Sequence, residues 1–254
     1  MQWIIPKTEI DKQYLTYGDF PKEYKIRREY CQKIRSIGKQ LELSNKLITL
    51  CQIIFNRYYL YIPINNETNI SYMISSIFFL CMKLEDCRTT DVNALKAVCT
   101  EQFKNIQTFN DNELYISERR LLVGINFDLN IETPHYYFEK FFMLFKLDMK
   151  MKLSSIAFIN DLCSTHITLT HSAFTIALLA ICFASKREKV ELKYELNVFL
   201  TNCNQCQLMF PEKYRNEEYQ KQHAHDMLFF IEFFEIQSDY VLEANQALNA
   251  LYHK

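Results

Sequence analysis

The sequence predicts an all-α protein, and three observations support this fold class. Only 3 glycines and 5 prolines occur in 254 residues, whereas β-sandwiches, β-barrels and doubly wound α/β folds need these residues at their many turns. Apolar side chains make up 49% of the chain, which is ample for a packed core, and they recur at helical spacing. The charged fraction of 23% is ordinary, so we expect a folded chain rather than a disordered one.

Five helices are expected in the first half of the chain. The apolar spacing predicts helices around residues 34–41, 47–58 and 70–81, a weaker one after Asp91, and one over 111–125. Ser44 stands where the second helix would begin. Serine is a favoured N-cap because its hydroxyl oxygen accepts a hydrogen bond from an otherwise free backbone N–H.

The helical pattern begins again near the middle of the chain. A helix is expected over 135–149, with Thr133 as its cap and Pro134 in its first turn. Further helices are expected at about 152–166, 171–186, 191–201, 222–236 and 239–251. The almost wholly apolar segment 75–83 is echoed by 178–186, and both end at a lysine. A helix that is apolar on all sides lies at the centre of its bundle. We therefore expect two five-helix bundles in tandem, each built around its third helix.

Charge and cysteine usage exclude several classes of function. The net charge is −1; residues 1–127 carry 17 basic and 14 acidic side chains, and the remainder 12 and 16. Neither half has the basic excess that binding to a phosphate backbone requires, so no direct nucleic-acid contact is expected. The N-terminus lacks a signal peptide's apolar stretch, and the longest apolar run, 173–184, is too short to span a bilayer. Nine irregularly spaced cysteines favour reduced thiols in the nucleus or cytosol.

No sequence pattern indicates that the chain is an enzyme. It contains no Gly-x-Gly-x-x-Gly, no Gly-x-x-x-x-Gly-Lys-Ser/Thr and no His-Glu-x-x-His. Three glycines, at 18, 38 and 124, leave little from which to build a phosphate-binding loop. We therefore predict neither a catalytic residue, nor a cofactor, nor a small-molecule substrate.

One weak metal-like pattern occurs in the second half. Cys203-x-x-Cys206 is followed by His223-x-His225, and two thiolates with two imidazoles are a tetrahedral zinc set. However, the His-x-His spacing is unusual, the gap is long and no second Cys-x-x-Cys accompanies it. We expect these four residues to flank a loop, and no metal site is predicted.

Two opposite charges at helix ends are the best candidates for function. Lys83 ends the apolar third helix, and Glu118 precedes the apolar pair Leu121-Leu122 in the fifth. The simplest interpretation is that both are solvated helix-end charges. The alternative is that the two charges lie at one rim of the bundle and grip exposed backbone groups of a partner's helix.

Several separated segments, in the right order, resemble the cyclins, and among them the transcriptional T and K types. The segments that carry this resemblance are Trp3-Ile4-Ile5-Pro6-Lys7, Arg27, Gly38-x-x-Leu41-x-Leu43-Ser44, Phe55-Asn56-Arg57-Tyr58-Tyr59, Leu80-Cys81-Met82-Lys83-Leu84-Glu85-Asp86 and Glu118-x-x-Leu121-Leu122-x-x-Ile125-x-Phe127-x-Leu129-x-Ile131-x-x-Pro134-His135. The similarity is strong over about 130 residues. In the second half of the chain only the pattern of helices is similar.

The resemblance implies a fold and the boundaries of its domains. A tandem cyclin-box fold is expected, with an N-terminal segment over 1–25 and a kinase-binding first box over 26–130. The second box is expected over 131–237 and a C-terminal helix over 238–254.

The resemblance also implies a function: binding and activating a cyclin-dependent kinase as its non-catalytic, nuclear subunit. Lys83 and Glu118 would hydrogen-bond backbone groups at the end of the kinase's regulatory helix. Leu122, Phe127 and Leu129 would form the apolar seat beneath that helix, and Arg27 would be a structural and interface residue. Cyclins of the T, K, L and C types bind their kinases through this same surface, so the sequence does not identify the kinase.

One departure and two rivals complete the sequence-based picture. Cell-cycle cyclins carry Met-Arg-x-x-Leu in the first helix as a docking groove, whereas this chain has Ile26-Arg27-Arg28-Glu29-Tyr30. Those charges favour a transcriptional role, with substrates such as RNA polymerase II or its factors.

One rival function is that of a general transcription factor with tandem cyclin folds that resembles factor IIB, but the zinc ribbon and basic faces of such factors are missing from this chain. The other rival is a helical scaffold without a kinase partner.

Overall fold

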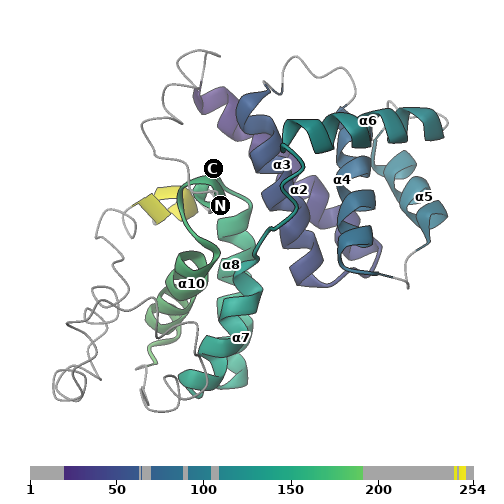
Figure 1. Ribbon diagram of the computed structural model, residues 1–254. Coiled ribbons are helices and arrows are strands. Elements are labelled where there is room, and N and C mark those ends of the chain that lie inside the picture. The colour runs from purple at the N-terminus through teal and green to yellow at the C-terminus, as the bar shows by residue number, and fades with distance from the viewer. Residues whose placement is uncertain are drawn as a thin grey trace. The chain divides into compact units, whose positions relative to one another are not determined.

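The computed structural model describes residues 20–62, 64, 70–87, 91–103, 109–190, 243–244 and 246–249. Throughout these residues the regular elements are helices, without any strand (Figure 1), which confirms the predicted fold class. The chain divides into two compact units. The first comprises Met1–Thr133 with Cys163–Thr170, and the second comprises Pro134–Leu162 with His171–Lys254.

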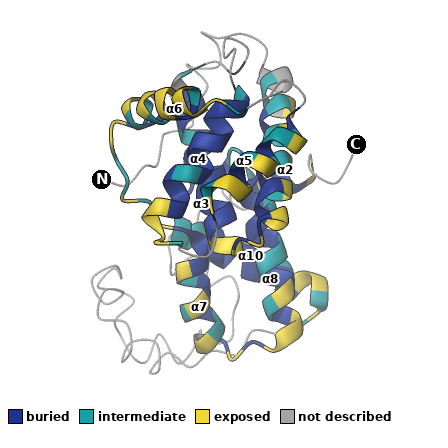
Figure 2. Ribbon diagram, turned by 90° about the vertical axis from the view of Figure 1, so that its right-hand side faces the viewer, coloured by how far each residue is buried: buried dark blue, intermediate teal, exposed yellow. Residues whose placement is uncertain are grey.

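The first unit is built around one apolar helix. Its helices are α2 (Phe20–Gln40), α3 (Asn45–Tyr61), α4 (Ile70–Leu84), α5 (Val92–Gln102), α6 (Asp111–Gly124) and the short α9 (Ile167–Thr170). Helix α4 contacts α3, α5 and α6, and it is buried along almost its whole length (Figure 2). The third of the five helices expected in the first half is therefore the central one, as predicted.

Small polar side chains let neighbouring helices approach α4 closely. Ser75 and Ser76 are fully buried in it. The hydroxyl of Ser75 donates to the carbonyl of Ser71 in the preceding turn at 2.8 Å. The hydroxyl of Ser76 donates to the carbonyl of Leu114 on α6 at 2.9 Å. Because each buried hydroxyl has a partner, neither carries the cost of an unsatisfied polar group.

Two of the helix starts expected from the sequence are confirmed by capping bonds, whereas the Thr133 hydroxyl, expected to cap the helix that begins at Pro134, is buried without a hydrogen-bond partner. The Ser44 hydroxyl accepts a hydrogen bond from the Leu47 N–H at 3.2 Å, which starts α3. Asp91 caps α5 through the Asn93 N–H at 3.1 Å. Each cap satisfies a backbone donor that has no partner within its own helix.

A segment distant in the sequence completes the first unit. The amide of Gln52 on α3 donates to the Ser164 hydroxyl at 3.0 Å. The amide of Asn56 donates to the Thr165 carbonyl at 3.2 Å and to the Thr168 hydroxyl at 3.3 Å. All of these groups are buried. The polar side chains on α3 therefore find their partners in 163–170, a segment that belongs to the expected second box.

The second unit contains α7 (Pro134–Leu144), α8 (Met149–Cys163, of which Cys163 counts with the first unit) and α10 (Ala173–Glu188). Helices α7 and α10 pack together, with the rings of Phe141 and Phe174 at 5.2 Å between centroids. Helix α10 begins at the Ser172 cap and buries most of its side chains. It is the apolar helix expected at 171–186.

The α7–α8 corner differs from the sequence-based expectation. One helix was expected over 135–149 and the next from 152, but α7 ends at Leu144 and α8 begins at Met149. Lys146 takes a left-handed backbone conformation with φ of 48°. The Asp148 carboxylate then accepts a hydrogen bond from the Met151 N–H at 2.7 Å and caps α8. The turn is made without glycine or proline, so no sequence signal marked it.

The helices expected at 191–201 and 222–236 lie outside the described residues. Of the helix expected at 239–251, residues 243–244 and 246–249 are described and are helical. Among the residues that the structure describes, none of the helices is long and apolar enough to cross a membrane.

Candidate functional site

The two candidate charges meet at one edge of the first unit. Lys83 lies in the last turn of α4 and Glu118 on α6, and they are 35 positions apart in the sequence. The Lys83 Nζ donates to Glu118 Oε1 in an ion pair. The lysine side chain is 49% exposed and that of the glutamate 12%. The pair therefore joins two helices of the core while leaving the ammonium group open to a partner.

An aromatic ring helps to hold the lysine in place. The Lys83 Nζ lies 4.3 Å from the centroid of the Phe79 ring, one turn earlier on α4. A cation over an aromatic face is attracted by the ring's electron density. The Phe79 ring in turn meets the Tyr115 ring of α6 at 6.2 Å in an edge-to-face arrangement. Lysine near a helix C-terminus is also favoured by the helix dipole.

The apolar residues predicted for the site differ in exposure. Leu122 and Leu129 are partly buried and pack against the core of the first unit. Phe127 is 65% exposed. Leu122 follows Glu118 by one turn, so both lie on the same side of α6. These residues combine a seat anchored in the core with one exposed aromatic ring.

The backbone that carries Phe127 is strained. Helix α6 ends in two consecutive left-handed residues, Asn126 with φ of 52° and Phe127 with φ of 55°. The Phe127 N–H donates to the Leu122 carbonyl at 2.8 Å, which closes the end of the helix. A bulky residue with positive φ is unusual and costs conformational energy. The rest of the folded structure compensates for this cost, and the large apolar ring is held exposed to solvent.

Arg27 is placed differently from the other predicted site residues. It is 3% exposed on α2, and its guanidinium donates to the Glu23 carboxylate at 2.8 Å and to the carbonyl of Asn56 at 3.1 Å. It also donates to the Tyr59 carbonyl. These bonds tie α2 to α3, so the guanidinium serves the fold and exposes little surface to a partner.

Sequence reasoning missed two apolar residues beside the ion pair. Tyr115, 53% exposed, lies about 60° around the helix from Glu118 on the basis of 100° per residue. Leu84 follows Lys83 at the end of α4 and is 38% exposed. A helical projection of residues 111–124 would have placed Tyr115 on the face of Glu118 and Leu122.

This arrangement can grip a helix end. An ammonium group donates to free carbonyls and a carboxylate accepts from free N–H groups, and helix termini carry both kinds of unpaired group. Within the described residues, no three His, Cys, Asp or Glu side chains gather to hold a metal ion. The weak zinc candidates Cys203, Cys206, His223 and His225 lie outside the described residues.

Comparison with known proteins points to one family. The family described as "Cyclin, N-terminal domain" matches residues 6–130. The chain is similar to cyclin pch1 of Schizosaccharomyces pombe, 28% identical over 206 residues, with 75% of this chain and 59% of that protein covered. It is also similar to the CTD kinase subunit beta of the same organism, 23% identical over 186 residues, covering 67% and 54%. The chain thus spans less than two thirds of the length of these relatives.

A solved structure agrees on the fold. A chain of the yeast RNA Pol II CTD kinase CTDK-1 complex superposes with a TM-score of 0.63 at 15% identity, and the match covers 99% of this chain and 83% of that one. This likeness shows a common helical architecture.

Proposed function

Residues 6–130 match the cyclin N-terminal domain family, and on this premise we propose that the chain is the regulatory subunit of a transcription-associated cyclin-dependent kinase. It contributes no catalytic group of its own. The observation that carries the proposal is the Lys83–Glu118 ion pair within the matched residues 6–130, whose lysine is 49% exposed and whose glutamate shares α6 with the exposed Tyr115 ring. The similarity to the CTD kinase subunit beta supports a kinase that acts on RNA polymerase II, and with it a nuclear location.

The mechanism follows from the rigidity of the first unit, the proposed kinase-binding box. A kinase of this class is active when its regulatory helix lies inward, so that the helix's glutamate pairs with the lysine that orients the ATP phosphates. A partner that binds only this inward state shifts the population towards it. Lys83 and Glu118 would hold the end of that helix by its backbone, and Leu122, Phe127 and Leu129 would bury its apolar side. Arg27 would act from beneath, by fixing α2 to α3.

The test is co-expression with transcription-associated cyclin-dependent kinases. Lys83→Ala and Glu118→Ala should each weaken kinase binding tenfold or more, because a shielded charge-assisted hydrogen bond is worth about 1.5–3 kcal/mol. Kinase activity towards a peptide of the RNA polymerase II C-terminal repeat should fall in parallel. Affinity is measured by titrating the purified kinase against the full chain.

The matched control is Lys96→Ala. Lys96 forms a comparable surface ion pair with Asp111, at 2.7 Å between α5 and α6, and belongs to no predicted interface. Its removal should leave binding and activation intact. If the Lys83 and Glu118 variants bind and activate the kinase as the unaltered chain does, the proposed interface is wrong.

A further inference from the structure

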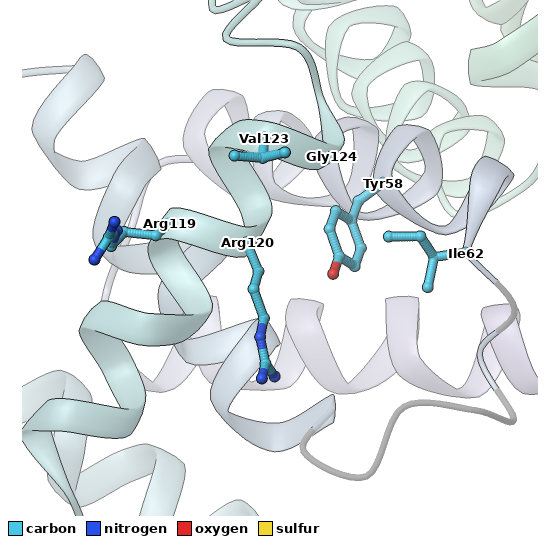
Figure 3. Close-up of a pocket in the computed structure, with 6 residues that line it drawn as sticks. All are labelled: Tyr58, Ile62, Arg119, Arg120, Val123 and Gly124. Atoms are coloured by element: carbon cyan, nitrogen blue, oxygen red, sulfur yellow. The ribbon is translucent and has the colours of Figure 1, made fainter.

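A pocket of about 480 Å³ lies between the C-terminal ends of α3 and α6 (Figure 3). It is lined by Tyr58, Ile62, Arg119, Arg120, Val123 and Gly124. None of these residues has a role in the proposed kinase interface. The volume lies within the range of about 300–1,000 Å³ that is typical of ligand pockets.

The walls of the pocket are apolar, and one glycine shapes them. A Cβ atom at Gly124 would lie 2.5 Å from Cε2 of the Tyr58 ring, so only glycine lets α6 come this close to α3. Val123 stands at the edge of the pocket with 62% of its surface exposed. A large apolar side chain from a partner would cover Val123 and contact Ile62, and this burial favours binding.

Two arginines give the pocket a positive rim. Arg119 and Arg120 are both exposed, and neither pairs with a carboxylate in the part of the chain that the structure describes. In Figure 3 the Arg120 side chain extends on the same side as the Tyr58 ring, whereas Arg119 points away from it. No acidic residue lines the pocket. The occupant that complements it is therefore both acidic and apolar.

The pocket lies on a different side of α6 from the proposed kinase contacts. At 100° per residue, Arg120 is about 160° around the helix from Glu118, and Gly124 is also about 160° from Leu122. The pocket residues Arg120 and Gly124 therefore face away from Glu118 and Leu122.

We propose that this pocket binds an acidic peptide segment of a second protein partner. One large apolar side chain of the peptide lies against Val123 and Ile62. A neighbouring carboxylate pairs with Arg120, whose planar guanidinium can hold both of its oxygens, and a further acidic residue reaches Arg119. A buried apolar anchor within a charged rim is the usual organisation of a peptide-binding site.

The experiment measures the binding of labelled peptides to the full chain by fluorescence anisotropy. The probe is a ten-residue peptide with a central leucine flanked by glutamates. One comparison peptide replaces the leucine with alanine, a second replaces the glutamates with lysines, and an RNA oligomer of similar length is the third probe. Only the leucine–glutamate peptide should bind well, and each replacement should cost roughly tenfold or more in affinity.

Variants of the chain test whether binding occurs at this pocket. Arg120→Glu should weaken peptide binding tenfold or more, and Arg119→Glu should weaken it less because that side chain points away. The control Lys25→Glu/Lys39→Glu changes exposed lysines on α2 and should leave binding unchanged. Equal binding by Arg120→Glu and the unaltered chain, equal loss in the lysine control, or preferential binding of RNA would overturn the proposal.

The same variants separate this proposal from the kinase interface. Arg120→Glu should keep kinase binding, and Lys83→Ala should keep peptide binding. Failure of the kinase experiment alone would therefore leave the peptide site standing, and failure of the peptide experiment would leave the kinase interface standing.

Discussion

Two ion pairs of the first unit contain the same kinds of charge but are used in different ways. Arg27 and Glu23 meet within α2 at 2.8 Å, with side chains only 4% and 14% exposed, and the arginine also holds two backbone carbonyls of α3. Lys83 and Glu118 join α4 to α6, with the lysine half exposed. A buried pair cannot lose one partner without stranding the other, whereas an exposed pair contributes little to stability. The two carboxylates are about equally buried, so it is the burial of the cation, 4% exposed for Arg27 and 49% for Lys83, that separates the charge that maintains the fold from the charge available to a partner.

The largest expected effect is on the buried pair. Arg27→Met should lower the free energy of unfolding by about 3–5 kcal/mol, because it leaves the Glu23 carboxylate and the Asn56 and Tyr59 carbonyls without their partner. Urea unfolding followed by circular dichroism measures the change. Lys25→Met, at an exposed position on the same helix, should change stability by no more than about 0.5 kcal/mol. Equal urea midpoints for Arg27→Met and the unaltered chain would mean that the buried Arg27–Glu23 pair does not stabilise the fold.

A neutral buried contact should have an intermediate effect. Asn56→Leu keeps the approximate volume of the side chain but removes the buried amide that donates to the Thr165 carbonyl and the Thr168 hydroxyl, so stability should fall by about 1–3 kcal/mol. The same urea titration measures the change, with the exposed Asn112→Leu as control. A loss as large as that of Arg27→Met would mean that charge is not what distinguishes the buried arginine.

The smallest effect on stability is expected at the exposed pair. Lys83→Ala should lower the free energy of unfolding by about 1 kcal/mol, because the lysine is half exposed although the Glu118 carboxylate that loses its partner is only 12% exposed. The melting temperature should therefore hardly change, even though kinase binding is expected to fall tenfold or more. If Lys83→Ala destabilised the chain as much as Arg27→Met, the Lys83–Glu118 pair would be structural and its assignment to a partner surface would fail.

Helix starts in this chain could be predicted from the sequence, but several helix ends could not. Ser44 and Asp91 mark starts because their side chains replace a missing backbone partner, and the same residue types recur at many helix starts. Helix ends usually carry glycine in the left-handed conformation. Here that conformation is taken by Glu42, Asp86, Asn126, Phe127, Lys146 and Lys189. The expected helix at 135–149 was too long for this reason.

The candidate site was predictable only in part. Lys83 and Glu118 were selected as opposite charges at the ends of apolar helices, and the resemblance to a family supplied their role. Nothing in their local sequence brings residues 35 positions apart together. The depth at which Arg27 is buried depends on two carbonyls of α3 and has no local signal. The pocket beside Arg120 depends on the close approach of Gly124 to Tyr58, which a single glycine at a helix end does not indicate.

The segment 163–170 also affects how the chain can fold and how it can be divided. Gln52 and Ser164 are 112 positions apart, so the first unit contains contacts of high sequence separation, which slow folding. A fragment that ended at Thr133 would contain nearly all of the first unit's helices, yet Gln52 and Asn56 would lose partners in its interior. During synthesis, α2 to α6 leave the ribosome well before residue 170 does. The first unit can therefore close completely only after residues 134–162 of the second unit have been made.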